Sequence, residues 1–313
     1  MTGGPHASTG PQLGGCLPAL VTPLTPEREI DEEGVRTLVS RAVADGASGV
    51  LVAGTTGEGT LLEPGQRAQV TRAARQALDE SSRGEGDSGG LLRLLAGASG
   101  PTVSSLAADV ERLAQAGAEA VLVLAPHTYP LAPDELADLH LDVADRAPVP
   151  TAIYHIPQLT GSWLTADAVV ELAGHPGIVG MKDSSPDAQR RSEFLAAVTP
   201  QHGFHLVTGH APSLRAALEA GAHGSITAVA NLRQHHVVAL HEAVADGDTE
   251  RSRRLQDMLT RLSEGIGAAG ASVPATLKAA LQLEGVIAER WCRPPLRSLD
   301  SKRLDRVRTA LMP

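Results

Sequence analysis

Short apolar runs recur along the chain, and the segments between them have the apolar spacing typical of amphipathic helices. A short apolar run bounded by glycine and polar residues predicts a buried strand. Eight such runs are present: Cys16–Thr22, Gly49–Ala53, Leu92–Gly97, Ala120–Leu124, Pro150–Tyr154, Ile178–Lys182, His205–Thr208 and Gly224–Ala228. Strands that alternate with helices lie parallel, and eight of them close into a barrel. We therefore predict an α/β chain with a (β/α)8 TIM barrel.

Three of the helix-to-strand junctions are near copies of one another, which supports a repeating unit. They are Asp45–Val50, Gln115–Val121 and Glu219–Ser225. In each junction a glycine ends the helix, and a small residue lets the next strand begin close by. The alternative fold is an open, doubly wound sheet. Such a sheet would want a glycine-rich dinucleotide loop after its first strand, and the sequence has none there.

The strand–helix alternation divides the chain into three parts. Residues 1–14 are rich in Gly, Pro and Thr and are predicted to form a flexible tail, whereas residues 15–247 form the barrel. Residues 248–313 contain three helical segments and form a C-terminal helical extension, which we expect to serve packing or assembly. The Gly/Ser-rich stretch Ser81–Gly90 is interpreted as a disordered loop without function.

Composition excludes several classes of protein. Hydrophobic residues make up 42% of the chain but aromatic residues only 2%, so the core must consist mostly of Ala, Val, Leu and Ile. A net charge of −9 argues against nucleic acid or an anionic membrane as a partner. Cys16 and Cys292 lack metal or redox spacing. Neither a membrane span nor a signal peptide is expected, so a cytoplasmic protein is the default.

Lysine is scarce, and one lysine stands at the end of a predicted core strand. Only Lys182, Lys278 and Lys302 are lysines among the 27 basic residues. Lys182 directly follows the apolar run Ile178–Met181. A primary amine can lose its proton and form a Schiff base with a carbonyl, which a guanidinium cannot do. The alternative is a strand-end lysine that simply reaches solvent.

Two other strand ends carry residues that suit the same chemistry, since the active site of such a barrel lies at the C-terminal ends of its strands. The second strand runs into Gly54–Gly59, where Thr55 and Thr56 stand among glycines. This pattern favours binding of a carboxylate, although an ordinary turn is the alternative. The fifth strand ends in Tyr154. Together these residues suit Schiff-base chemistry on a 2-oxo acid, with lysine as nucleophile and tyrosine as proton shuttle.

Four motifs in order also carry a family resemblance. They are Gly54–Glu58, Tyr154-x-x-Pro157, Gly180–Asp183 and Gly221-Ala222-x-Gly224-x-Ile226. From about Gly15 to about Leu299 the chain resembles the dihydrodipicolinate synthase / N-acetylneuraminate lyase family. The resemblance implies a barrel with a C-terminal helical region, usually a homotetramer. It also implies a covalent Schiff base between Lys182 and pyruvate, an aldehyde as second reactant, and no cofactor or metal.

The resemblance also implies roles for individual residues. Lys182 would form the Schiff base, Tyr154 would transfer protons, and Thr55 would assist as a catalytic residue. The expected substrate-binding residues are Thr55, Thr56, Gly57, Thr128, His155, Leu159, His210 and Ile226.

Three departures from the family pattern narrow the range of expected substrates. Leu159 stands where dihydrodipicolinate synthases carry a carboxylate-binding arginine, so that activity is not expected. Thr128 replaces a tyrosine that commonly extends the proton relay, and Tyr129 lies one residue further on. The acidic pair of sialic acid lyases after the seventh strand is missing from Thr208–Pro212. A sialic acid substrate is therefore not expected either.

Three histidines, His127, His155 and His210, follow different strands. They could line the pocket and assist proton transfer, or be solvated loop residues. We do not expect them to bind zinc, and we interpret Asp183 as a structural turn acceptor. The predicted function is a class I aldolase or lyase that cleaves or forms a 2-oxo acid. The alternatives are a Schiff-base dehydratase or hydratase-aldolase, and a non-catalytic barrel that binds a 2-oxo acid.

Overall fold

The computed structural model describes residues 12–81, 93–198 and 203–311 of the 313-residue chain. Most of the predicted tail, 1–14, and of the predicted loop Ser81–Gly90 lies outside these ranges. Leu13, by contrast, is fully buried and belongs to the apolar cluster inside the barrel. The tail prediction therefore does not hold for Leu13, because its side chain contributes to the barrel interior.

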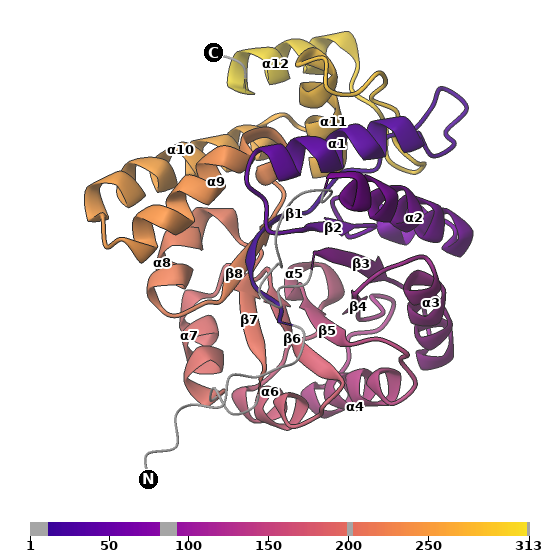
Figure 1. Ribbon diagram of the computed structural model, residues 1–313, viewed down its shortest axis with the longest axis vertical. Helices are drawn as coiled ribbons and strands as arrows, with labels where there is room; N and C mark the ends of the chain where they lie inside the picture. The colour runs from indigo at the N-terminus through magenta and orange to yellow at the C-terminus, as the bar shows by residue number, and fades with distance from the viewer. Residues whose placement is uncertain (1–11, 82–92, 199–202, 312–313) are drawn as a thin grey trace.

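Eight parallel strands form one nearly closed sheet at the centre of the molecule (Figure 1). Neighbouring strands follow the order of the chain, with β1 beside β8. A parallel bridge between Ala19, which directly follows β1, and Leu51 of β2 brings these two strands together. The strands are β1 (Gly15–Pro18), β2 (Val50–Val52), β3 (Leu94–Ala98), β4 (Ala120–Leu124), β5 (Thr151–His155), β6 (Ile178–Asp183), β7 (His205–Thr208) and β8 (Gly224–Thr227). The predicted (β/α)8 barrel is confirmed, although β1 ends at Pro18 rather than at Thr22.

Helices surround the barrel (Figure 1). Those between successive strands are α1 (Glu32–Ala44), α2 (Pro64–Ser81), α3 (Val103–Gln115), α4 (Pro133–Ala144), α5 (Pro157–Thr160), α6 (Ala166–Ala173), α7 (Ala188–Ala197) and α8 (Leu214–Glu219), with the 3-10 turns η1 (Gly59–Leu61) and η3 (Ala211–Ser213). After β8 follow α9 (Ala230–Ala245), α10 (Thr249–Ala268), α11 (Val273–Leu283) and α12 (Ser301–Leu311). None of the helices among the described residues has the length and apolar character needed to cross a membrane.

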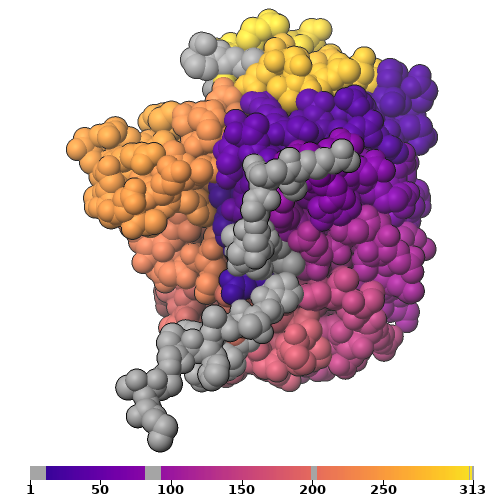
Figure 2. Space-filling model, viewed as in Figure 1, coloured from indigo at the N-terminus to yellow at the C-terminus, as the bar shows by residue number. Residues whose placement is uncertain are grey.

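The C-terminal helices pack against the early part of the chain. In the space-filling view the yellow C-terminal segment lies beside the indigo N-terminal segment (Figure 2). Glu284, just after α11, links them by ion pairs to Arg41 of α1 at 3.2 Å and to Arg233 of α9 at 2.7 Å. These pairs are half-buried, so packing of the apolar faces, rather than the charges, supplies most of the stabilisation here.

β6 contains a bulge. Ile178 pairs with Thr151, but Gly180 pairs with the next residue of β5, Ala152, so that Val179 is an extra residue in β6. A bulge of this kind shifts the alternation of side chains along its strand.

The bulge decides where the lysine points. Side chains on a regular strand alternate between its two faces, so Val179 and Met181 would otherwise share a face. In the structure Val179 lies inside the barrel, Met181 lies in the layer between strands and helices, and Lys182 faces Tyr154. If β6 paired with β5 without a bulge from Ile178 onward, Lys182 would pair with the outward-facing His155 and its side chain would project toward the helices.

A buried ion pair fixes the loop after β2 to the C-terminal region. Glu58 follows the Thr55–Gly57 segment and adopts a left-handed conformation, with φ of 58°. Its carboxylate lies 2.5 Å from Nζ of Lys278, and both side chains are 0% exposed. The main-chain N–H of Arg293 donates to the same carboxylate at 2.6 Å, and Lys278 also donates to the carbonyl of Trp291 at 2.7 Å.

A second buried pair holds the other side of the same loop. Arg67 of α2 contacts Asp109 of α3 at 2.8 Å, with 5% and 2% of the side chains exposed. The guanidinium also donates to the carbonyl oxygens of Gly59 at 3.0 Å and Leu62 at 2.5 Å. Buried ion pairs therefore hold the uncharged Thr55–Gly57 segment in place from both sides.

Replacing Gly180 by alanine tests the close packing at the bulge. A Cβ at this position would lie 2.1 Å from the main-chain oxygen of His205, so β6 and β7 would have to separate. We expect Gly180→Ala to lower the free energy of unfolding by about 1–3 kcal/mol, measured by urea denaturation. Gly65→Ala is the control, because a Cβ there meets nothing within 4 Å. Equal stability of the two variants would contradict the close contact.

Removing one charge of the Glu58–Lys278 pair should be costly, because the other charge is left buried without compensation. We expect Lys278→Met to lower the free energy of unfolding by about 3–5 kcal/mol. The double variant Lys278→Met/Glu58→Gln should regain most of this loss, since no isolated charge remains. A double variant that is no more stable than Lys278→Met in urea denaturation would show that the pair does not act as one unit.

Candidate active site

A cavity of about 300 Å³ opens at the C-terminal ends of the strands. Thr55, Tyr154, Lys182 and Ile226 line it from the ends of β2, β5, β6 and from β8. Residues of α10 and α11, among them Ile266, close it on another side. The cavity therefore depends on the barrel and on the C-terminal helices together.

Lys182 and Tyr154 are in direct contact inside this cavity. They are paired residues on the neighbouring strands β6 and β5. The Lys182 Nζ donates to the Tyr154 hydroxyl at 3.2 Å and lies 4.3 Å from the centroid of the phenol ring. Lys182 is 3% and Tyr154 4% exposed, so both groups are largely removed from water. An amine and a phenol in contact can exchange a proton.

The surroundings of Tyr154 favour its ionised form. Burial by itself raises the pKa of the phenol, but the charge of Lys182 and the hydroxyl and main chain of Thr55 lower it more. The net effect places the pKa of Tyr154 below its ordinary value of 10.0. The Thr55 hydroxyl itself makes no hydrogen bond of regular geometry within the described part of the chain. It therefore acts on Tyr154 as a nearby dipole and remains available to a ligand.

The loop that carries Thr55 is a tight, well-bonded turn. The N–H of Glu58 donates to the carbonyl of Thr55 at 3.1 Å, and the N–H of Gly59 donates to the carbonyl of Gly54 at 2.9 Å. The Thr22 hydroxyl donates to the carbonyl of Gly57 at 2.7 Å. With its carbonyl groups so occupied, the loop presents hydroxyl groups to the cavity, and hydroxyl groups can bind a carboxylate.

Most residues that the sequence singled out converge on this cavity. Its lining includes Thr55, Thr56, Tyr154, Leu159, Lys182, His210 and Ile226. Gly57, Thr128 and His155 are not among the lining residues. The geometry therefore corrects the prediction that these three residues bind the substrate. The reason differs for each residue.

Gly57 has a structural role. A Cβ at this position would lie 2.9 Å from the carbonyl oxygen of Leu20, so only a glycine fits without a shift of the main chain. Its own carbonyl is bonded to Thr22. Gly57 thus allows the loop to pack against the segment after β1, and Thr55 and Thr56 face the cavity instead.

His155 points to the outside of the barrel. Adjacent residues of a strand face opposite sides, and Tyr154 faces inward. The His155 ring packs against Trp163 and Phe194, its Nδ1 lies 2.8 Å from Asp183, and its Nε2 accepts from the N–H of Leu164 at 3.5 Å. The strand alternation could have indicated this orientation from the sequence.

Asp183 is the centre of this outward-facing network. Its carboxylate accepts from His155, from the N–H of Ser185 at 3.1 Å and from Nε of Arg191 at 2.9 Å. Burial by itself raises the pKa of the carboxyl, but His155 and Arg191 lower it more, so that the pKa of Asp183 is below its ordinary value. Asp183 therefore anchors the end of β6 as an ionised acceptor.

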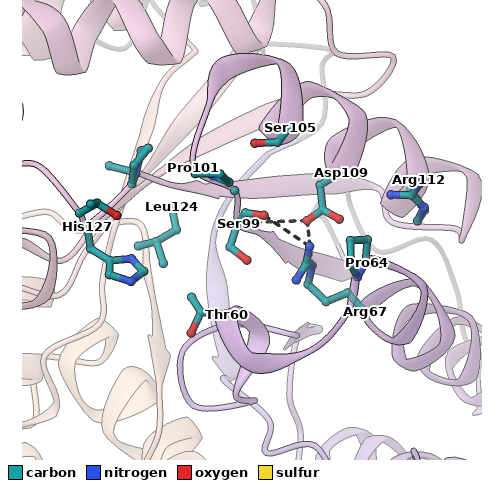
Figure 3. Close-up of a pocket in the computed structure, with 14 residues that line it drawn as sticks. Thr60, Pro64, Arg67, Ser99, Pro101, Ser105, Asp109, Arg112, Leu124 and His127 are labelled. Atoms are coloured by element: carbon teal, nitrogen blue, oxygen red, sulfur yellow. Dashed lines mark hydrogen bonds and ion pairs between the residues drawn. The ribbon is translucent and has the colours of Figure 1, made fainter. Parts of the chain in front are cut away.

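Thr128 and His127 line a second cavity, of about 330 Å³, beside α2 and α3 (Figure 3). Figure 3 shows the Arg67–Asp109 pair there, with Asp109 also accepting from the main-chain N–H of Ser99 at 3.2 Å. Within the part of the chain that the structure describes, the exposed Thr128 forms no hydrogen bond with Tyr154 or Thr55. Within one chain, the geometry does not connect Thr128 to the Lys182 cavity.

Sequence reasoning missed part of the cavity wall. Ser184 and Gln158 line it, and Gln158 donates to the carbonyl of Ser184 at 2.9 Å. Ser263, Ile266 and Val273 come from the C-terminal helices, which we expected to serve packing or assembly only. Nothing in the sequence of α10 identified it as a wall of the site, because its role depends on how the helix packs.

Lys182 is the sole charged side chain that lines this cavity, as far as the described residues extend. Most of the remaining wall is apolar, with Leu159, Ile226, Ile266 and Val273 as its larger side chains. The cavity can thus surround an uncharged group, but it offers no second cation beside the amine.

Comparison with known proteins agrees with this arrangement. A family model described as the dihydrodipicolinate synthetase family matches residues 12–312. An uncharacterized DapA-like lyase of Halobacterium salinarum is 33% identical over 305 residues, which are 96% of this chain and 94% of the relative. The 4-hydroxy-tetrahydrodipicolinate synthase 1 of Streptomyces coelicolor is 33% identical over 289 residues, or 92% and 90% of the two chains.

Solved structures share the fold. A dihydrodipicolinate synthase, DapA-2, of Bacillus anthracis superimposes with a TM-score of 0.87 at 21% identity, covering 96% of this chain and 98% of that one. YagE of E. coli K12, solved in complex with pyruvate, gives a TM-score of 0.84 at 25% identity, with 95% and 96% covered. Because the family model and the relatives span nearly the whole sequence, this chain is a lyase of the dihydrodipicolinate synthetase family.

Proposed function

We propose that this protein is a class I aldolase that joins pyruvate to an aldehyde, or cleaves the corresponding 2-oxo acid, through a Schiff base on Lys182. The observation that carries the proposal is the buried contact between Lys182 and Tyr154 at 3.2 Å. It provides a nucleophilic amine and a proton-transfer group at the same point in the cavity. No cofactor or metal is part of the proposed chemistry.

The proposed reaction begins with attack of the neutral Lys182 amine on the C2 carbonyl of pyruvate, followed by loss of water to give a protonated imine. The phenolate of Tyr154 accepts a proton from C3, and the imine nitrogen accepts the electron pair of the broken C–H bond, which gives an enamine. The enamine carbon then attacks the aldehyde carbonyl, and Tyr154 donates a proton to the new alkoxide. Hydrolysis of the imine releases the product and regenerates the amine.

Thr55 and Thr56 supply the carboxylate site in this proposal. Both line the cavity with Lys182, and Thr55 also stabilises the ionised form of Tyr154. Hydroxyl groups bind a carboxylate without adding charge to the cavity.

The second substrate is proposed to be an uncharged aldehyde. Leu159, which stands in place of the carboxylate-binding arginine, lies in the cavity wall and is 57% exposed. Its side chain therefore offers no charge to a substrate. The synthase relatives are named for a product with two carboxylates, and such a product needs a partner for each. We further propose that the protein assembles as the homotetramer that the family resemblance implies. One structural neighbour is described as a monomeric dihydrodipicolinate synthase variant.

The experiment that tests the proposed function is a screen for turnover. Pyruvate is incubated with benzaldehyde, butanal or glyceraldehyde, and the condensation product is identified by its mass. Product formation by the wild type and its absence with Lys182→Arg is the expected result, because arginine retains the charge but cannot form an imine. Turnover that persists in Lys182→Arg would refute the assigned mechanism.

Aspartate semialdehyde should be a poor substrate. No cation other than Lys182 lines the cavity among the described residues, so the carboxylate of this aldehyde lacks a cationic partner. We expect kcat/KM for aspartate semialdehyde to be at least about 10-fold below that for butanal, since an unpaired charge in the cavity costs more than 1.4 kcal/mol. Efficient consumption of the semialdehyde, followed with pyruvate in excess, would contradict this substrate assignment.

The pH dependence of cleavage should follow the ionisation of Tyr154. Thr55→Val removes one group that lowers the pKa of Tyr154, so the pKa should rise toward its ordinary value. In the cleavage direction the phenolate acts as base, and the rising limb of kcat should therefore move to higher pH. An unchanged pH profile in Thr55→Val would argue against Tyr154 as the base.

Tyr154→Phe should lower kcat by about 10²–10⁴-fold, the usual contribution of a positioned acid–base group.

A further inference from the structure

His210 lies between β7 and η3 and lines the Lys182 cavity. The preceding residue, Gly209, packs directly against the reactive lysine, since a Cβ there would lie 2.9 Å from Lys182 Cε. His210 is half-buried and is the only histidine in the cavity wall among the described residues. Its chemical state therefore bears directly on what the cavity can bind.

The hydrogen bonds around His210 favour one tautomer of its ring. Nδ1 lies 2.8 Å from the hydroxyl oxygen of Ser213, and Arg191 donates to that same oxygen at 3.0 Å. Arginine is a donor only, so the Ser213 oxygen accepts from it and has its own hydrogen available for His210. The alternative acceptor, the His210 carbonyl, is more distant, at 3.5 Å. The shorter contact favours Ser213 as the donor to Nδ1, which leaves the hydrogen of the neutral ring on Nε2.

The surrounding charges keep the ring neutral. Burial and the positive charge of Arg191 both lower the pKa of His210 below its ordinary value, while Asp183 acts in the opposite direction. The Asp183 carboxylate is already bonded to His155, Ser185 and Arg191. A doubly protonated ring would also lose the hydrogen bond that Nδ1 accepts.

Nε2 of His210 has no hydrogen-bond partner within the described residues. We propose that His210 is a specificity residue that donates a hydrogen bond from Nε2 to an oxygen in the aldehyde-derived half of the substrate. Ser213, held by Arg191, is the positioning residue that selects this tautomer. The inference rests on the proposed aldolase function, because the aldehyde must occupy the space next to the Lys182 imine.

The proposal narrows the substrate class. An apolar wall and one fixed neutral donor suit an uncharged aldehyde that carries a hydroxyl, ether or carbonyl oxygen. The donor is paired only when such an oxygen is present, so a hydrocarbon aldehyde leaves it without a partner. The same geometry assigns no proton-relay role to His210, since Nε2 already carries a hydrogen and Nδ1 is occupied.

Two pairs of aldehydes, matched in size within each pair, form the test. Butanal and methoxyacetaldehyde differ by an ether oxygen in place of a methylene group; pentanal and 3-methoxypropanal shift that oxygen by one carbon. For each pair, the ratio of kcat/KM between ether and hydrocarbon is measured with pyruvate in excess. Comparing this ratio between variants removes the intrinsic difference in reactivity between the aldehydes.

We expect His210→Leu to lower the ether-to-hydrocarbon ratio by about 2- to 12-fold in at least one pair, mainly through KM, as for the loss of one hydrogen bond. His210→Gln should largely retain the wild-type ratio, because its amide N–H can replace Nε2–H. His127→Gln, in the second cavity, is the matched control and should leave the ratio unchanged. If His210→Leu has the wild-type ratio in both pairs, the donor role is refuted.

The tautomer is tested separately. In ¹⁵N-histidine-labelled protein, the signal assigned through its loss in His210→Gln should show one Nε2–H tautomer throughout pH 6–9. Ser213→Ala should give a mixture of tautomers. A protonation step of this signal near the ordinary value of about 6.5, matched by an acid limb of kcat that His210→Gln removes, would overturn the proposal in favour of acid–base catalysis.

Failure of this inference is distinguishable from failure of the proposed function. Reduction of the wild type with borohydride in the presence of pyruvate reports imine formation alone and does not depend on the aldehyde. A normal imine together with wild-type aldehyde ratios in His210→Leu would reject only the role of His210. Absence of the imine would reject the aldolase function, while the NMR measurement would still report the tautomer.

Discussion

The contact between Lys182 and Tyr154 depends on the placement of two neighbouring strands. Paired residues of β5 and β6 bring the amine and the phenol together, and the extra residue in β6 turns the lysine inward. Because the contact is built on strands of the barrel, its geometry has little freedom to vary. The low exposure of both groups strengthens their mutual influence, since fewer water dipoles screen it. The reactivity of the site thus follows from the register of the sheet.

Thr55, the third member of this group, is placed by a different device. Its loop contains no charge that reaches the cavity, yet two buried ion pairs hold it from outside. Glu58–Lys278 connects the loop to the C-terminal region, and Arg67–Asp109 connects it to α2 and α3. The same C-terminal region supplies part of the cavity wall. The helices after the barrel therefore contribute both to the position of Thr55 and to the space for the second substrate.

The sequence predicted the barrel well, because eight apolar runs and three near-identical junctions report the same repeat. The sequence also predicted that Lys182, Tyr154 and Thr55 lie at the same end of the barrel, since the C-terminal ends of its parallel strands converge there. It did not predict the bulge at Val179, which depends on pairing between strands. His155 was misplaced because alternation along β5 was not applied to it. The wall formed by Ile266 and the state of His210 depend on packing between segments far apart in sequence, for which a single sequence has no local signal.

The central claim is that Lys182 is the nucleophile, and the mass of the peptide modified by pyruvate tests it most directly. The chain contains only three lysines, so borohydride reduction followed by peptide mass mapping gives an unambiguous answer. Lys278 is fully buried in its ion pair with Glu58, which leaves its amine inaccessible to pyruvate. One reduced pyruvyl group on Lys182 alone is the predicted result. A modification confined to Lys278 or Lys302, or no modification of any lysine, would contradict the account.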